Sequence, residues 1–179
     1  RYACELDTAR AEREACFADD PPPCKHAFGK HHGTTGGVFA WFCKHGICYG
    51  FNIMPTAEGR DEAYSFLVSY FKRAPRYVVY DFACQLEEFC LNRAPAFFKD
   101  TVFVVDNFHW CNHVACSLGF SAAMHSALAG VNTQVAEQSN SRLKAQVARI
   151  ASVMAQSTFM LTLRYHYCNK NMQAKARMA

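Results

Sequence analysis

Two aspartates follow short apolar runs that are typical of buried strands. Asp81 comes directly after residues 77–80, and Asp106 comes directly after residues 102–105. Because sites in parallel α/β sheets form beyond the carboxyl ends of the strands, the carboxylates of two neighbouring strands could lie close together. Like charges repel at short distance, and a divalent cation removes that repulsion. The two strand ends therefore predict a cation site.

Glu137, near the start of the next helical region, could add a third oxygen. Mg²⁺ prefers carboxylates together with retained waters. Two such ions would activate an attacking oxygen and stabilise a leaving one in phosphoryl transfer. Asp81, Asp106 and Glu137 are therefore the candidate catalytic residues and the candidate ligands of Mg²⁺ or Mn²⁺. The alternative is that both aspartates are N-caps of the helices that follow them.

A second group of candidate ligands is rich in histidine and cysteine. His109, His113 and Cys116 fall within eight consecutive positions. On a helix, the two histidines would face the same side, with the cysteine three residues further on. They could supply three ligands of a tetrahedral Zn²⁺, with Cys84 or Cys90 as the fourth. The alternative is a polar loop beside buried cysteines.

The N-terminal half of the chain predicts strands that alternate with helices. Residues 38–42 and 47–53 are strand-like runs around a short turn that contains Gly46, which predicts an antiparallel hairpin. From Asp61 the apolar period becomes helical. The predicted apolar face of that helix consists of Tyr64, Leu67, Val68 and Phe71.

The remaining elements predict the fold class. Residues 77–81 and 102–106 read as parallel strands, joined by a crossover helix from residue 82 to residue 93. The C-terminal third reads as helical, with a stripe of apolar residues and a last helix capped by Ser157 and ending at Tyr167. The order β-β-α-β-α-β-α predicts an α/β fold with a mixed sheet flanked by helices. The stripe consists of Leu143, Val147, Ile150 and Met154.

The composition indicates a packed domain. Apolar residues make up 51% of the 179 residues and charged residues 19%, which excludes wholesale disorder. No apolar run approaches the ~20 residues that cross a bilayer, so no membrane partner is expected. The net charge of +4 permits an anionic partner. The ten cysteines favour a reducing compartment in which most of them are buried.

Three segments are expected along the chain. Residues 1–37 contain three consecutive prolines and a Gly- and His-containing stretch, and predict a poorly ordered segment. Residues 38–170 form the predicted domain, and residues 171–179 form a C-terminal tail. The predicted DNA-contacting side chains, on the more exposed positions of the helical region, are Arg142, Lys144 and Arg149.

Four short motifs, in order, resemble those of the Kyakuja-Dileera-Zisupton transposases. Residues 80–84 resemble the Tyr-Asp-x-x-Cys motif of that family. Residues 36–46 resemble its Gly-x-Phe and Cys-x-His-Gly segment, and residues 105–113 resemble its Asp-x-Phe-His-x-x-x-His segment. Residues 132–141 resemble the late acidic segment. The resemblance covers roughly residues 34 to 170, judged by motif order.

The resemblance implies an RNase H-like fold. It matches Asp81 to the second acidic residue of the family and Glu137 to the third, and it leaves Asp106 as an extra ligand. The first strand and its catalytic aspartate have no match, because no part of residues 1–37 reads as a strand that ends in Asp. The expected fold is therefore RNase H-like without its first strand, and the acidic set is incomplete. Either the chain is a piece of a longer protein or the copy is inactive.

The resemblance also implies a function and a location. The expected activity is cleavage and transfer of DNA strands with Mg²⁺ or Mn²⁺, on transposon ends or target DNA, in the nucleus. An oligomer is compatible with this activity. The alternative is a non-catalytic DNA- or protein-binding module derived from such a transposase and stabilised by zinc. A third class is a metal-dependent nuclease unrelated to transposition.

Overall fold

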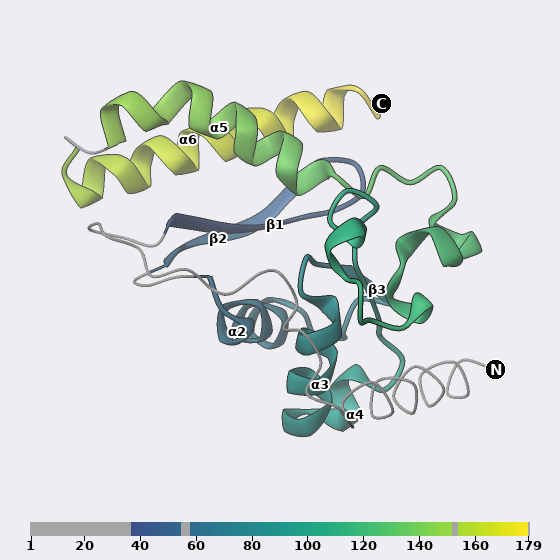
Figure 1. Ribbon diagram of the computed structural model, residues 1–179. Helices are drawn as coiled ribbons and strands as arrows, with labels where there is room; N and C mark the ends of the chain where they lie inside the picture. Colours follow the sequence, from purple (N-terminus) through teal and green to yellow (C-terminus); the bar gives the residue numbers. More distant parts are fainter. Residues whose placement is uncertain (1–36, 55–57, 152–153, 179) are drawn as a thin grey trace. The chain divides into compact units, whose positions relative to one another are not determined.

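The computed structural model describes residues 37–54, 58–151 and 154–178, apart from the side chains of residues 148–150 (Figure 1). The segment predicted to be poorly ordered, residues 1–36, lies outside the described residues. The chain divides into two compact units. The described part of the first unit is Gly37 with Met54–Gly130. The second unit combines Val38–Ile53 with the chain from Val131 onward.

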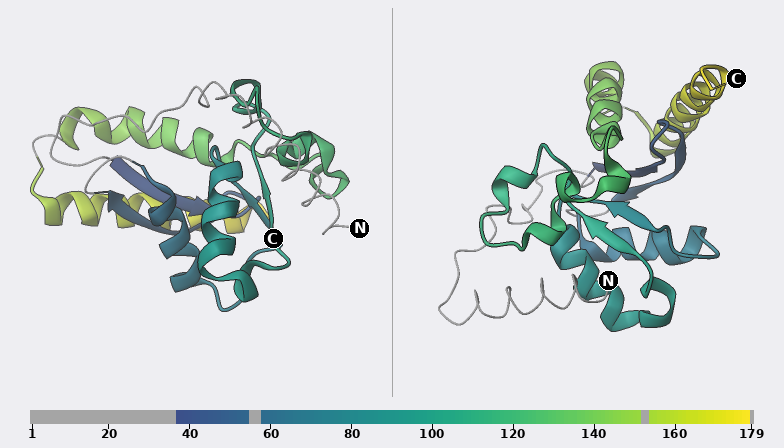
Figure 2. Two further views of the ribbon diagram at one scale, coloured as in Figure 1. Left: turned by 60° about the horizontal axis from the view of Figure 1, so that its bottom comes forward. Right: turned by 90° about the vertical axis from the view of Figure 1, so that its right-hand side faces the viewer.

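A small parallel sheet is at the centre of the first unit. Strand β3 (Tyr77–Val79) pairs in parallel with β4 (Val102–Val104), and both strands are visible in the right panel of Figure 2. In this pairing Val78 lies opposite Phe103. Directly after β4, an isolated parallel bridge pairs Val105 with Ser121. The prediction of two parallel strands is confirmed, although each strand ends two residues before the aspartate at which it was expected to end.

Three helices complete the first unit. They are α2 (Arg60–Tyr70), α3 (Ala83–Arg93) and the short α4 (Pro95–Phe98). Helix α2 buries residues at the spacing i, i+3, i+4, namely Ala63, Phe66 and Leu67. The predicted apolar face was therefore only partly right, because Val68 is 36% exposed. The stripe lies one residue earlier, since the buried Ala63 and Phe66 precede the predicted Tyr64 and Leu67 by one position.

The second unit is built on a hairpin and two helices. Strands β1 (Gly37–Phe42) and β2 (Cys48–Met54) form a two-stranded sheet, as predicted. Gly46 closes the turn between them with φ 81°, a left-handed conformation that favours glycine. Helices α5 (Val135–Ala151) and α6 (Gln156–Ala176) follow, and both lie along the hairpin in Figures 1 and 2.

Packing of both helices on the hairpin forms the core of the second unit. The buried members of this cluster are Cys48, Leu143, Val147, Leu163 and Tyr167. The Tyr167 ring contacts the rings of Phe42 and Phe51, at centroid distances of 5.9 and 5.1 Å. Because these residues come from all four elements, the unit holds together as one packed layer on the hairpin.

The predicted mixed α/β class is confirmed at that level, and three details differ. The described strands form two separate two-stranded sheets instead of a single mixed sheet. Ser157 does not cap the last helix, because α6 begins at Gln156 after Ala155. That helix also extends beyond the predicted end at Tyr167, so the segment expected as a tail is helical as far as Ala176. In this part of the helix Ala174 is buried and Asn171 is half-buried.

Candidate functional site

The carboxyl ends of β3 and β4 position the two aspartates. The Tyr80 amide donates to the Val104 carbonyl at 3.0 Å, so the pairing continues past the end of β3. Asp81 follows directly and is half-exposed, with 36% of its side chain accessible. Asp106 follows Val105 and is buried, with 4% of its side chain accessible. The parallel register thus places one accessible and one buried carboxylate at the same edge of the sheet.

The His109 ring brings the two carboxylates together. Its Nδ1 lies 3.2 Å from Oδ1 of Asp81 and 2.6 Å from Oδ2 of Asp106. The two carboxylate oxygens are therefore no more than 5.8 Å apart. A proton on this nitrogen is shared between two acceptors, which offsets their mutual repulsion. His109 was expected beside cysteines, and the structure places it beside the acidic residues instead.

Asp106 also organises the turn that carries His109. Its Oδ1 accepts hydrogen bonds from the backbone N–H groups of Phe108 at 2.7 Å and His109 at 3.2 Å. Neither aspartate is the helix N-cap that the alternative expected. The N-cap residue of the 3₁₀ turn Trp110–Asn112 is His109, the N-cap residue of α3 is Phe82, and no side chain caps either one. Asp106 instead stabilises the bend before that turn. A carboxylate has about four lone-pair sites, so Asp106 retains acceptor capacity.

A separate group of sulfur and nitrogen ligands lies in the same unit. Nδ1 of His113 is 3.8 Å from the sulfur of Cys84 and 3.4 Å from the sulfur of Cys116. Ligand atoms of all three residues lie within 4.8 Å of one another. In a tetrahedral zinc site, bonds of about 2.3 Å to sulfur and 2.0–2.1 Å to nitrogen separate the ligand atoms by about 3.6 Å. The group therefore has the dimensions to hold Zn²⁺.

The His113 ring is fixed by aromatic neighbours. It stacks in parallel on Trp110 at a centroid distance of 6.0 Å and meets the edge of Phe82 at 6.4 Å. Cys84 and His113 are both buried. Of the two candidates for the further zinc ligand, the structure brings Cys84 into the group, and Cys90 contributes to the buried face of α3 instead.

Local backbone geometry explains why His109 and His113 separate. The i, i+4 arrangement requires an α-helix, and the chain instead forms a single 3₁₀ turn over Trp110–Asn112. His113 follows this turn with φ −96° and ψ 56°, which is not helical. Residues 81–84 consequently give one side chain to each group, Asp81 to the first and Cys84 to the second. Residues 106–116 give two to each: Asp106 and His109 to the first, and His113 and Cys116 to the second. The spacing Asp-x-x-His, in residues 106–109, was the sequence signal for the first pairing.

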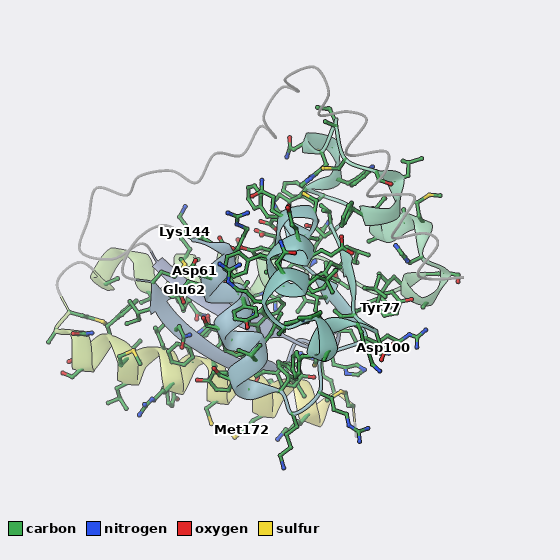
Figure 3. The ribbon with its side chains drawn as sticks, turned by 90° about the horizontal axis from the view of Figure 1, so that it is seen from below. Asp61, Glu62, Tyr77, Asp100, Lys144 and Met172 are labelled. Carbon is green, nitrogen blue, oxygen red and sulfur yellow. The ribbon has the colours of Figure 1, made fainter. Side chains whose placement is uncertain are left out.

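The remaining predicted site residues lie in the second unit. Glu137 is in the first turn of α5 and is exposed. Arg142 and Lys144 are exposed on the same helix, and Figure 3 labels Lys144. Arg149 is also within α5, and its side chain is outside the described part. The three basic residues therefore share one helix, as predicted.

Comparison with known families decides the ancestry of the chain. The sequence model described as "Kyakuja-Dileera-Zisupton transposase" matches residues 25–171. The chain belongs to the Kyakuja-Dileera-Zisupton transposase family. Family membership implies transposase-related DNA processing, DNA binding and a divalent metal. No curated protein and no solved structure matches the chain significantly.

The matched region includes both metal-ligand groups and most of α6. None of the described helices of this family member is long and apolar enough to cross a lipid bilayer.

Proposed function

We propose that this chain is the metal- and DNA-binding core of a transposase domain for DNA strand cleavage and transfer. The proposed ligands of Mg²⁺ or Mn²⁺ are Asp81, Asp106 and Glu137, the last by family resemblance. The proposed fold is RNase H-like, with the order of elements from β1 to α5 following that fold after its first strand. The proposed location is the nucleus, where such a domain meets chromosomal DNA.

One observation carries the metal assignment. Oxygens of Asp81 and Asp106 approach the same atom, Nδ1 of His109, from the ends of two adjacent parallel strands. Two oxygens on one Mg²⁺ are at most about 4.2 Å apart, given bonds of 2.0–2.1 Å. The upper limit of 5.8 Å for this pair is close enough for a small side-chain rotation, or a retained water, to complete the coordination.

The two aspartates would divide the work by their exposure. The half-exposed Asp81 faces solvent, so it can meet both a hydrated cation and a phosphate group. The buried Asp106 holds the His109 ring and the turn, which limits the rotation of its own carboxylate. When bound, a divalent cation would neutralise charge on a phosphate and activate an attacking oxygen. The protein residues fix where that cation sits.

Binding of Mn²⁺ tests this assignment. Titration calorimetry of the wild-type chain should give heats of binding, and Asp81→Asn should weaken the binding about ten-fold or more, because a charged ligand is lost. Asp100→Asn is the matched control, since Asp100 is an exposed carboxylate of the same unit, labelled in Figure 3. Equal heats for wild type and Asp81→Asn would refute the site.

A zinc-stabilised binding module is the second candidate function, and the Cys84–His113–Cys116 group supports it. Nδ1 of His113 already lies at tetrahedral spacing from both sulfurs, and the three ligand atoms are within 4.8 Å of one another. Three protein ligands leave one position for water or for a further side chain. Zinc at this group would connect α3 to the segment after β4, and would hold the domain together independently of any strand chemistry.

Metal content and thermal stability test the zinc site. The chain purified without chelator should contain about one zinc, and Cys84→Ser should lose it. EDTA should lower the melting temperature of the wild type, because the free energy of metal binding is coupled to folding. Cys111→Ser is the matched control: Cys111 is exposed and its sulfur contacts the Phe108 carbonyl. An unchanged melting curve in EDTA would contradict the proposal.

A further inference from the structure

A cavity of about 270 Å³ lies within the second unit, at the β1–β2 turn and the helices α5 and α6. Its charged and imidazole-bearing lining residues are Lys44, His45, Arg142, His166, Lys170 and Arg177. The other lining side chains include the polar groups of Asn132, Gln138 and Ser139, and none of the described residues that line this cavity carries a carboxylate. A cavity with this lining favours an anion.

The charge of the whole unit agrees with its cavity. The two segments of the second unit contain eight lysines and arginines and a single carboxylate, Glu137. Residues 54–130 contain six lysines and arginines against eight carboxylates. The net charge of +4 is therefore unevenly distributed: the second unit is strongly basic, and residues 54–130 are mildly acidic. Such segregation is the electrostatic signature of a surface that binds a polyanion.

His166 gives an independent indication of a ligand. His166 is 8% exposed, and its Nε2 atom is buried without a hydrogen-bond partner among the described residues. Buried polar atoms in folded proteins are nearly always paired, so an unpaired one on a side chain that lines a cavity points to a group that this side chain could bind after a small rotation. Burial, and to a lesser degree the nearby Lys170 ammonium, lower the pKa of His166. The neutral ring can carry its proton on Nε2 and donate it to an oxygen.

The size and rigidity of the cavity narrow the class of ligand. Pockets for drug-sized ligands and cofactors have volumes of about 300–1,000 Å³, so this cavity suits a smaller group, such as one phosphate with its neighbouring sugar. The elements around it are fixed by the core of the second unit. Asn171 on α6 bonds both the N–H and the carbonyl of Cys48 on β2, at 2.8 and 2.9 Å.

We propose that this cavity binds a backbone phosphate of DNA, with Lys170, Arg142 and the Nε2–H of His166 as donors. The choice of DNA as the source of the phosphate rests on the proposed DNA-processing function. The evidence for an anion-binding cavity comes from the lining residues of the second unit and does not depend on that function. The site adds Lys44, Lys170 and Arg177 to the DNA-binding residues, all of which are distant in sequence from the basic positions on α5.

Fluorescence anisotropy of a labelled single-stranded oligonucleotide tests the proposal, at several salt concentrations and without added divalent metal. Lys170→Gln should weaken binding about ten-fold and reduce the slope of log K against log[salt] by about 1, as expected for one lost phosphate contact. Lys175→Gln is the matched control, because Lys175 is exposed on the same helix and does not line the cavity. His166→Phe should weaken binding without changing the slope, since it removes a neutral donor.

Two results would overturn the proposal. Equal losses for Lys170→Gln and Lys175→Gln would show that only general surface charge acts. If inorganic phosphate bound in a Lys170-dependent way while DNA binding did not depend on Lys170, the cavity would be a site for free phosphate. Because no divalent metal is added, these outcomes are separate from failure of the Asp81 site, which the Mn²⁺ titration reports.

Discussion

At the scale of single residues, Asp106 has a structural task that its position at a strand end does not reveal. It is buried and accepts hydrogen bonds from two backbone N–H groups and from the His109 ring. A carboxylate that is satisfied in this way orders its loop whether or not it also binds a cation. Asp81 is the more accessible of the two.

The hydrogen bonds of Asp106 predict unequal losses of stability for two substitutions at this position. Asp106→Ala should lower the free energy of unfolding by about 2–3 kcal/mol, because two part-buried backbone N–H groups and the His109 ring lose a charged acceptor. Asp106→Asn should cost less, about 1–2 kcal/mol, since its amide oxygen can still accept from the backbone. Urea unfolding measures both, with Asp100→Ala as the control at an exposed carboxylate. A loss under 0.5 kcal/mol for Asp106→Ala would contradict the role assigned to its hydrogen bonds.

At the scale of elements, α6 and β2 are joined by one side chain. The Asn171 side chain accepts a hydrogen bond from the Cys48 N–H and donates one to the Cys48 carbonyl. It therefore pairs with the strand backbone as a neighbouring strand would. Burial also raises the pKa of the Cys48 thiol to about 11, which keeps it protonated at neutral pH. Asn171 and Cys48 therefore form an uncharged contact between two residues that are 123 positions apart in the sequence.

Removing this contact should loosen the hairpin from the helix. Asn171→Ala should cost about 1–3 kcal/mol, because two buried backbone groups of Cys48 lose their partner. For a chain of this size, that corresponds to a melting temperature lower by roughly 2–12 °C. Asn169→Ala, on the same helix, should change little. Amide exchange of Cys48 is the direct measurement, and unchanged protection in Asn171→Ala would refute the contact.

At the scale of the whole molecule, net charge and the side-chain groups of the first unit are distributed differently. The second unit contains eight lysines and arginines and one carboxylate, Glu137, whereas the Asp81–Asp106 pair and the Cys84–His113–Cys116 group belong to the first unit. We therefore expect Lys170→Gln to weaken DNA binding and leave the zinc content unchanged, and Cys84→Ser to lose zinc and keep DNA binding.

The chain by itself should bind DNA without cleaving it. Two-metal phosphoryl transfer needs carboxylates on both ions, and a misplacement of about 1 Å can cost ~100-fold in rate. Asp106 ends the later strand and is committed to His109, so it is a poor substitute for the first acidic residue of the family. We expect no nicking of supercoiled plasmid in Mn²⁺, together with DNA binding that weakens as salt rises.

Plasmid nicking has a direct control. Nicking by the wild type that disappears in Asp106→Asn would contradict this expectation and make Asp106 a catalytic ligand. Nicking that persists in both Asp81→Asn and Asp106→Asn would instead indicate a contaminating nuclease. DNA binding is measured on the same protein samples, so loss of folding is detected separately from loss of activity.

The sequence by itself determined the local elements and the family. Apolar alternation and helical periodicity act within about ten to twenty neighbouring residues, so the hairpin, the parallel strands and the strand-end aspartates could be predicted from them. The register of a helical face was harder, as the exposed Val68 shows, because neighbouring elements decide which side is covered.

Only the tertiary structure decided which side chains meet. A 3₁₀ turn in place of a helix sent His109 to the aspartates and His113 to Cys84, which is 29 residues away in sequence. The cavity lined by Lys44, Arg142 and Lys170 arises because two helices pack on a hairpin that is about 90 residues distant from the first of them. Such contacts depend on chain closure between remote segments, and no local pattern in the sequence encodes them.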